Sequence, residues 1–178
     1  MAPSDMTPQE LADELSRLHE DGFGWALSCC GWNEPQAEDV LQTAYVRVIS
    51  GKARFGGRSA FRTWFFGVIR RVAQEHGRRD RTFGRRHAEI DVVGQDRLAV
   101  HDHPVDDMAR AEDSRRLLHA MDELPERQRE VLHLVFYQDM TIAEAAAVMG
   151  VGLGSARTHY DRGKKRMRVL LEEGAGHG

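Results

Sequence analysis

The apolar residues between positions 61 and 72 constrain the fold more strongly than any other feature of the chain. They recur three and four residues apart, at Phe61, Trp64, Phe65, Val68, Ile69 and Val72. This spacing places them on one face of an α-helix, whereas a strand would need alternation with a period of two. We expect this helix to run to about Gly77. Its outer face is basic and carries Arg62, Arg70, Arg71 and Arg78.

Helix signals also occur on both sides of this segment. Thr7, Pro8 and Glu10 have the pattern of a capping box with proline in the first turn, and an apolar stripe from Leu11 to Cys29 follows, weakened at two glycines. Pro35 is placed to begin the next helix and Gly51 to end it. The apolar stripe of that helix is formed by Val40, Leu41, Ala44, Val48 and Ile49. Helical spacing returns at Leu117, Leu118, Met121 and Leu124, and Pro125 opens a further helix with Val131, Leu134 and Val135 facing inward.

The segment from Arg86 to Glu112 lacks this periodicity. It is acidic and contains Gly94 and Pro104, as is typical of a linker. With no convincing strand elsewhere, the sequence predicts an all-α fold of two small helical domains joined by a flexible linker. The expected bounds are 1–85 for the first domain, 86–112 for the linker, 113–172 for the second domain and 173–178 for a tail.

The net charge of −3 over 178 residues hides a strong segregation. Residues 47–87 hold twelve Lys and Arg against two Asp and Glu, and residues 154–170 hold six against one. Two basic blocks separated by an acidic segment indicate two contacts with a polyanion, of which nucleic acid is the commonest. No apolar run approaches the roughly 20 residues that span a bilayer, and no secretory signal is present, so we expect a cytoplasmic protein without membrane insertion.

A glycine-rich stretch, "MGVGLGSARTHYDRGKKRM" from Met149 to Met167, superficially resembles a nucleotide-binding loop. Its G-x-G-x-G spacing departs from the dinucleotide fingerprint, and no Gly-Lys-Ser/Thr follows as a Walker loop requires. The preceding residues read as a helix that begins with a capping box of Thr141 and Glu144. We therefore predict a helix, a tight turn that uses glycine at positive φ, and a second helix from about Gly154, which is a helix-turn-helix.

The second helix of this motif has two chemically different faces. The face expected to pack inward holds Ala156, Tyr160, Gly163, Met167 and Leu170. The other face begins with side chains that can donate hydrogen bonds, as a helix that reads the major groove requires. We expect it to contact DNA through Ser155, Arg157, Thr158, His159, Arg162 and Lys165.

Two segments together resemble the extracytoplasmic-function sigma factors, the smallest bacterial initiation sigma factors. The first is "AEDVLQTAYVRVISGKARFGGRSAFRTWFFGVIRRVAQEHGRR" and the second is "LPERQREVLHLVFYQDMTIAEAAAVMGVGLGSARTHYDRGKKRM". The resemblance implies a sigma domain 2 that binds core RNA polymerase and melts the −10 element, followed by a sigma domain 4 that reads the −35 element. It also implies an anti-sigma factor as a partner and contacts with the coiled coil of the largest polymerase subunit and with the polymerase flap.

The resemblance further assigns roles to individual positions. Core polymerase binding would involve Asp39, Leu41, Gln42, Tyr45 and Val46. The −10 element would be bound by Lys52, Arg54, Phe55, Arg58, Ser59, Arg62, Arg70, Arg71, Gln74 and Arg78. The −35 element would be read by the six residues of the helix-turn-helix named above. In the family a better helix former usually stands where this chain has Gly163, and in an exposed setting that glycine would cost about 1 kcal/mol.

The sequence leaves two other classes of protein as alternatives. One is a helix-turn-helix regulator that binds DNA without core polymerase. The other is a metal-dependent enzyme that would use His87, His101, His103 and His119, but these residues lack the helical HExxH pattern and cysteine partners. We expect no catalytic residue, no metal and no cofactor.

Overall fold

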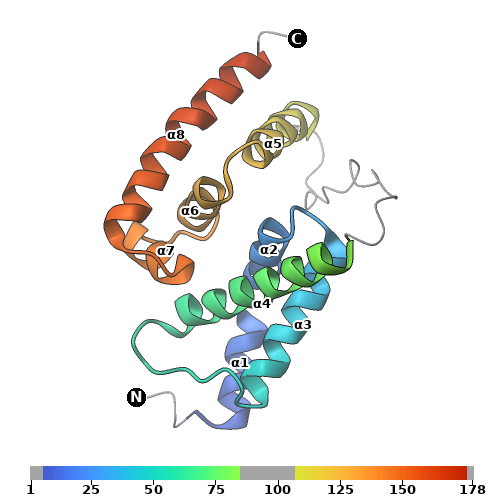
Figure 1. The fold of residues 1–178 in the computed structure, drawn as a ribbon, viewed down its shortest axis with the longest axis vertical. Helices are drawn as coiled ribbons and strands as arrows, with labels where there is room; N and C mark the ends of the chain where they lie inside the picture. Colours follow the sequence, from blue (N-terminus) through green and yellow to red (C-terminus); the bar gives the residue numbers. More distant parts are fainter. Residues whose placement is uncertain (1–5, 85–106, 176–178) are drawn as a thin grey trace.

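The computed structural model describes residues 6–84 and 107–175, and all regular structure in these ranges is α-helical (Figure 1). The helices are α1 (Pro8–Arg17), α2 (His19–Cys29), α3 (Glu34–Ile49), α4 (Phe61–Gly84), α5 (Asp107–Asp122), α6 (Glu126–Phe136), α7 (Ile142–Met149) and α8 (Leu153–Ala175). The all-α prediction is confirmed. No helix in the described ranges is both long and apolar enough to cross a bilayer.

Helices α1 and α2 occupy the segment that the sequence predicted to be one helix weakened at two glycines. The expected capping box starts α1, with the Glu10 amide donating to Oγ1 of Thr7 at 3.2 Å and the Thr7 amide donating to the Glu10 carboxylate at 2.7 Å. The break falls at Leu18 and not at the glycines. Gly22 lies inside α2, where a Cβ would stand 3.4 Å from both Ile69 and Leu41, so the missing side chain lets α2 approach α3 and α4 closely.

The N-terminal half, which consists of α1–α4, is held together by the apolar stripe of α4. Phe65, Phe66 and Ile69 are fully buried and pack with Trp25 of α2 and Val40 of α3. Burial of such large apolar side chains contributes about 1.5–3 kcal/mol each to folding. The core of this half therefore sits among α2, α3 and α4.

The C-terminal half, which consists of α5–α8, contains the predicted helix-turn-helix, formed by α7 and α8. Its capping box is also confirmed, because the Glu144 amide donates to Oγ1 of Thr141 at 3.2 Å and the Thr141 amide donates to the Glu144 carboxylate at 2.7 Å. Helices α5 and α6 pack against α8 through a smaller cluster of Met121, Leu124 and Leu132.

The two halves pack against each other. Helix α7 lies along α4, and α6 contacts α2, as the central part of Figure 1 shows. The main hydrophobic cluster is continuous across this boundary, since Val131, Leu134, Val148 and Met149 belong to it together with the core of the N-terminal half. The described residues therefore form one body with a shared core.

Three details differ from the sequence-based expectations. Helix α4 continues to Gly84, beyond the expected end near Gly77. Helix α5 begins at Asp107, inside the segment expected to be linker, and α8 continues to Ala175, inside the expected tail. Helical apolar spacing is sparse at these ends, so only local helix propensity marked them. The rest of the expected linker lies outside the described residues.

Candidate nucleic-acid interface

The start of α8 presents the residues expected to read DNA. Gly150 ends α7 in the left-handed conformation with φ of 66°, so the positive-φ turn predicted for this stretch is present. Neither Gly152 nor Gly154 has positive φ, and α8 begins at Leu153, slightly earlier than expected. Ser155, Arg157, Thr158, Arg162 and Lys165 are exposed, and His159 is half-buried.

The inner face of α8 packs as the sequence predicted. Ala156 is fully buried, and Tyr160, Met167 and Leu170 pack on the core formed by α5 and α6. Gly163 is buried too, and a Cβ at this position would stand 3.1 Å from Cδ1 of Leu132. Gly163 therefore lies on the inward face as predicted, and the cost given for an exposed glycine does not apply, because the missing side chain allows α8 to approach α6. This contact holds the opposite, basic face of α8 outward.

A basic loop between α3 and α4 carries the first group of expected −10 contacts. Lys52, Arg54 and Arg58 are exposed, while Phe55 and Ser59 are half-buried. The Phe55 ring lies edge-on to Phe61, with centroids 5.4 Å apart, and 5.2 Å from the Trp64 ring. The side chains around this aromatic group line a cavity of about 360 Å³, formed by Met6, Leu11, Val48, Ala53, Arg54, Phe55, Phe61 and Trp64.

The arginines of α4 fall into two groups. Arg71 and Arg78 are exposed, and Gln74 is half-buried. Arg62 and Arg70 instead contact the C-terminal half, Arg62 through Oε1 of Gln138 at 2.9 Å and Arg70 through the buried carboxylate of Glu130. In this conformation the guanidinium of Arg70 is not accessible to DNA, so its expected role applies only to a conformation in which the halves have separated.

The burial of α3 residues corrects one expectation for polymerase binding and one for core packing. Leu41 is only 3% exposed and belongs to the core, so it supports the helix and offers no contact surface. Ile49, expected in the buried stripe, is 68% exposed and lies near Val46, which is 60% exposed. An isolated apolar stripe does not distinguish its edge from its centre, which is why Ile49 was misplaced. With Asp39 and Gln42, these two residues form the exposed α3 surface.

Tyr45, also expected at this surface, is half-buried. Its ring stacks on Phe65 with centroids 5.6 Å apart, and its hydroxyl lies 2.9 Å from Nδ1 of His19. Partial burial raises the pKa of Tyr45 above its ordinary value. Tyr45 therefore joins the core of the N-terminal half to the α3 surface.

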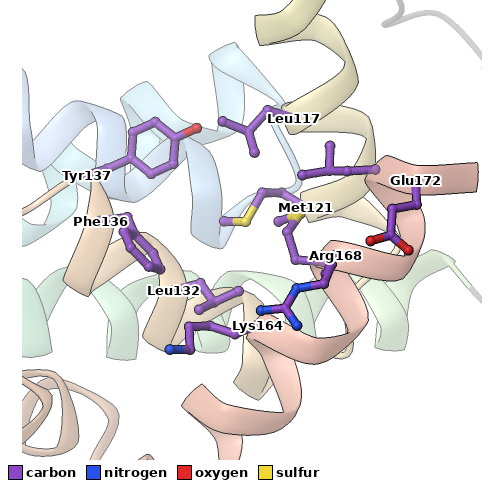
Figure 2. Close-up of a pocket in the computed structure, with 10 residues that line it drawn as sticks. Leu117, Met121, Leu132, Phe136, Tyr137, Lys164, Arg168 and Glu172 are labelled. Carbon is purple, nitrogen blue, oxygen red and sulfur yellow. The ribbon is translucent and has the colours of Figure 1, made fainter. Parts of the chain in front are cut away.

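An apolar groove of about 770 Å³ between α5, α6 and α8 was not predicted from the sequence (Figure 2). Leu117, Met121, Leu132 and Phe136 project into it from the α5 and α6 side, and Phe136 is 59% exposed. Lys164 and Arg168 lie along its α8 side, followed by Glu172. The groove thus combines apolar walls with a basic rim.

Of the four histidines that could be imagined as metal ligands, only His119 lies in the described part of the chain. His119 lies on α5 with Nδ1 3.3 Å from Oε1 of Glu123, an exposed i,i+4 pair. His87, His101 and His103 lie outside the described residues. Cys29 and Cys30 are half-buried free thiols.

Comparison with known protein families matches the N-terminal half and the C-terminal half to two different family models. The family model for sigma-70 region 2 matches residues 16–83, and the model for sigma-70 region 4 matches residues 114–167. The first match contains α2, α3, the basic loop and nearly all of α4, and the second contains the end of α5, all of α6 and α7, and the larger part of α8. The fold and surfaces thus define a two-part, promoter-binding type of protein.

Individual relatives support the same class. The chain is 32% identical over 145 residues to the ECF RNA polymerase sigma factor SigX of Bacillus subtilis, covering 78% of this chain and 74% of that protein. It is 28% identical over 165 residues to the RNA polymerase sigma factor CarQ of Myxococcus xanthus, covering 93% and 91%. The chain belongs to the extracytoplasmic-function (ECF) family of RNA polymerase sigma factors.

Solved structures share the fold. The sigma factor RpoE of Bartonella quintana, solved in complex with the anti-sigma factor NepR, superimposes with a TM-score of 0.70 at 22% identity, covering 92% of this chain and 98% of that one. CnrH, solved with the cytosolic domain of CnrY, gives a TM-score of 0.64 at 22% identity, covering 94% and 90%.

Proposed function

We propose that this protein is an alternative sigma factor that binds core RNA polymerase and directs promoter-specific transcription initiation. The observation that carries the proposal is the presence, in one chain, of two basic surfaces on separate helical halves that match sigma regions 2 and 4. A regulator acting without polymerase would not need the first half, and the comparisons give that alternative no support.

The start of α8 is proposed to read the −35 element as duplex DNA. Its exposed residues include two arginines, Arg157 and Arg162, and bidentate contact of arginine with guanine is the commonest specific contact in the major groove. Ser155, Thr158, His159 and Lys165 would add hydrogen bonds to base edges or phosphates. Thr158 already donates its hydroxyl to the carbonyl of Gly154 at 3.0 Å, which leaves that oxygen able to accept a hydrogen bond.

The loop and the start of α4 are proposed to bind the non-template strand of the −10 element. Single-stranded DNA is bound by combining aromatic rings with cations that follow the backbone. The cavity beside Phe55, with Arg54 at its edge, provides that combination. Lys52, Arg58, Ser59 and Arg71 would extend the contact, followed by Gln74 and Arg78 along α4.

Polymerase is proposed to contact both halves. The α3 surface, with Asp39, Gln42, Tyr45, Val46 and the additional Ile49, would bind the coiled coil of the largest subunit. The groove between α5, α6 and α8 would receive an apolar helix of the flap, and its basic rim of Lys164 and Arg168 favours a helix that also carries acidic residues. An anti-sigma factor is the further partner that the family and the RpoE–NepR complex suggest. We also propose that the protein is cytoplasmic and acts without catalysis or a cofactor.

The decisive experiment is run-off transcription with core polymerase on a promoter library. A promoter-dependent product that requires this protein is expected, and neither product nor binding to core would contradict the proposal. Arg157→Ala and Arg162→Ala should weaken −35 duplex binding while leaving core binding intact. Arg115→Ala, an exposed change on α5, is the matched control and should alter neither. Loss of duplex and core binding together would indicate misfolding of the variant.

A further inference from the structure

A polar cavity of about 300 Å³ lies between α2, α4 and α6. These helices meet near the middle of Figure 1, where α2 contacts both α4 and α6. The charged side chains that line the cavity are Arg70, Arg78, Arg81, Arg129, Glu126 and Glu130. Arginine therefore exceeds glutamate by two charges, and the cavity as a whole favours an anion.

The two glutamates do not compensate all of these arginines. Glu130 is paired with Arg70, whose Nε donates to Oε1 at 2.6 Å and whose Nη2 donates to Oε2 at 3.2 Å. Glu126 is exposed, so water weakens its interactions with other charges. Within the described ranges neither glutamate forms an ion pair with Arg81 or Arg129. These two arginines therefore leave positive charge in the cavity.

Arg129 is the more deeply placed of the two, because its side chain is only 19% exposed. Among the described residues, the only carboxylate within 4.0 Å of it is that of Asp122, with Nη1 and Oδ1 4.0 Å apart. That same Oδ1 already accepts the indole hydrogen bond of Trp32 at 2.7 Å. The guanidinium forms no hydrogen bond with another described residue. A largely buried cation without hydrogen-bond partners is unfavourable, and an anionic ligand would supply them.

Arg81 approaches the cavity from its α4 side. Its Nε donates to the carbonyl of Gly77 at 3.2 Å, so the side chain folds back along the helix. Gly77 itself lines the cavity, and a Cβ there would stand 3.8 Å from Nη2 of Arg81 and within 4 Å of no other residue. The missing side chain of Gly77 thus leaves open the space beside the Arg81 guanidinium.

The remaining polar lining is neutral. Burial raises the pKa of the Cys29 thiol well above its ordinary value, so the thiol is protonated at neutral pH and does not repel an anion. Ser28 and Gln74 add a hydroxyl and an amide, both able to donate hydrogen bonds. Guanidinium groups match the oxygens of phosphate in a bidentate manner, and the cavity volume is at the lower end of the range for small-molecule sites.

We propose that this cavity binds a small anion bearing phosphate groups, held principally by Arg81 and Arg129. Because its walls come from both α4 and α6, the site exists only in the folded chain, and an occupant raises the stability of the fold. The proposal does not rest on the proposed function, since its test uses neither polymerase nor a promoter.

Titration calorimetry of the full chain with inorganic pyrophosphate tests the binding, with sodium chloride at matched ionic strength as the reference. We expect a Kd of about 1 mM or below. At a tenfold excess of pyrophosphate over the Kd, the thermal midpoint should rise by about 3 °C or more above that in sodium chloride.

Four variants locate the anion. Arg81→Gln and Arg129→Gln should each weaken pyrophosphate binding about tenfold or more, because each removes charge-assisted hydrogen bonds. Arg79→Gln is the matched control, an exposed arginine of α4 that does not line the cavity, and it should bind as the wild type does. Gly77→Leu places a side chain in the cavity and should abolish binding while keeping the helical circular dichroism.

Absence of pyrophosphate binding by the wild type would overturn the proposal. An equal loss of affinity in Arg79→Gln and Arg81→Gln would indicate an adventitious ion only, attracted by net charge. Wild-type affinity in Gly77→Leu would place the anion outside the cavity. Random single-stranded DNA should bind Gly77→Leu normally, and a loss as large as that for pyrophosphate would assign the cavity to the DNA backbone. Should Arg129→Gln fail to fold, the exposed Arg81→Gln still decides.

Discussion

Trp32 and Asp122 are 90 positions apart, yet the indole of the first donates a 2.7 Å hydrogen bond to the carboxylate of the second. The bond links the turn between α2 and α3 to the end of α5. Trp32 also contacts the ring of His133, with centroids 6.5 Å apart, so its side chain lies in the interface between the halves.

Removing this bond should lower stability measurably. In a double-mutant cycle of Trp32→Phe and Asp122→Ala, we expect a coupling of about 1 kcal/mol in the free energy of unfolding, since Asp122 is half-exposed and solvent weakens the bond. Urea denaturation measures it. The pairing of Trp32→Phe with Glu123→Ala, whose carboxylate faces His119, should show no coupling; an equal value there would refute a direct contact.

Acid should destabilise the folded protein through His133. Its ring lies 5.4 Å from Trp25 and 5.2 Å from Tyr137, and its Nδ1 has no hydrogen-bond partner among the described residues. Burial lowers the pKa of His133 from 6.5 to about 3. Because the folded pKa is depressed, stability is fully present above pH 6.5 and is lost as the pH falls from 6.5 toward 3.

The measurement compares wild type with His133→Phe, in which this titration is absent. Between pH 7 and pH 5 the wild type should lose about 2 kcal/mol of unfolding free energy relative to the variant. Other groups titrate in both proteins and cancel in the difference. Parallel stability curves over this range would mean that His133 is accessible to protons in the folded protein.

The three glycines of the helix-turn-helix should differ in their sensitivity to substitution. Gly150→Ala places a Cβ at φ of 66° and should destabilise the protein by about 1–2 kcal/mol. Gly152→Ala meets no atom within 4 Å and has no positive φ, so its effect should stay within about 0.5 kcal/mol. Thermal denaturation of both variants checks this, and equal losses would show that the turn conformation is not the cause.

Gly163→Ala should be destabilising even though alanine favours helix by about 1 kcal/mol. The added methyl group would stand 3.1 Å from Leu132 and 3.3 Å from Cβ of Gln128, which is fixed by the α6 backbone. In contrast, Gly174→Ala has open space and should be neutral or slightly stabilising. Denaturation midpoints decide the sign, and a stabilised Gly163→Ala would mean that α6 and α8 can move apart freely.

The exposed apolar residues of α3 should matter for binding and not for folding. Val46→Lys and Ile49→Lys should each change stability by less than about 0.5 kcal/mol, since both side chains are exposed and cations suit a helix C-terminus. Core polymerase binding, measured by anisotropy of labelled protein, should weaken about tenfold or more. Val169→Lys, an exposed apolar position on α8, should bind normally.

Local features of this fold could be predicted from the sequence because their causes are local. The capping box of Thr141 and Glu144, the left-handed Gly150 and the inner face marked by Ala156 each depend on residues within one or two helical turns. Spacing alone was sufficient to place them.

The contacts between the halves could not be predicted in this way. Arg70 and Glu130 are 60 positions apart, and Arg62 and Gln138 are 76 apart. An arginine on the polar side of a helix has the same sequence pattern whether it faces solvent, DNA or a buried carboxylate. The groove beside Phe136 could not be predicted either, because it forms only where α5, α6 and α8 pack against one another.

Because α4 and α7 share a core, the binding of a ligand to either half is thermodynamically linked to the packing of the two halves against each other. A ligand that prefers the separated halves must weaken the affinity of any ligand that prefers them packed together, and by the same factor. A partner that binds both halves at once therefore stabilises their packed arrangement without contacting a residue at the start of α8.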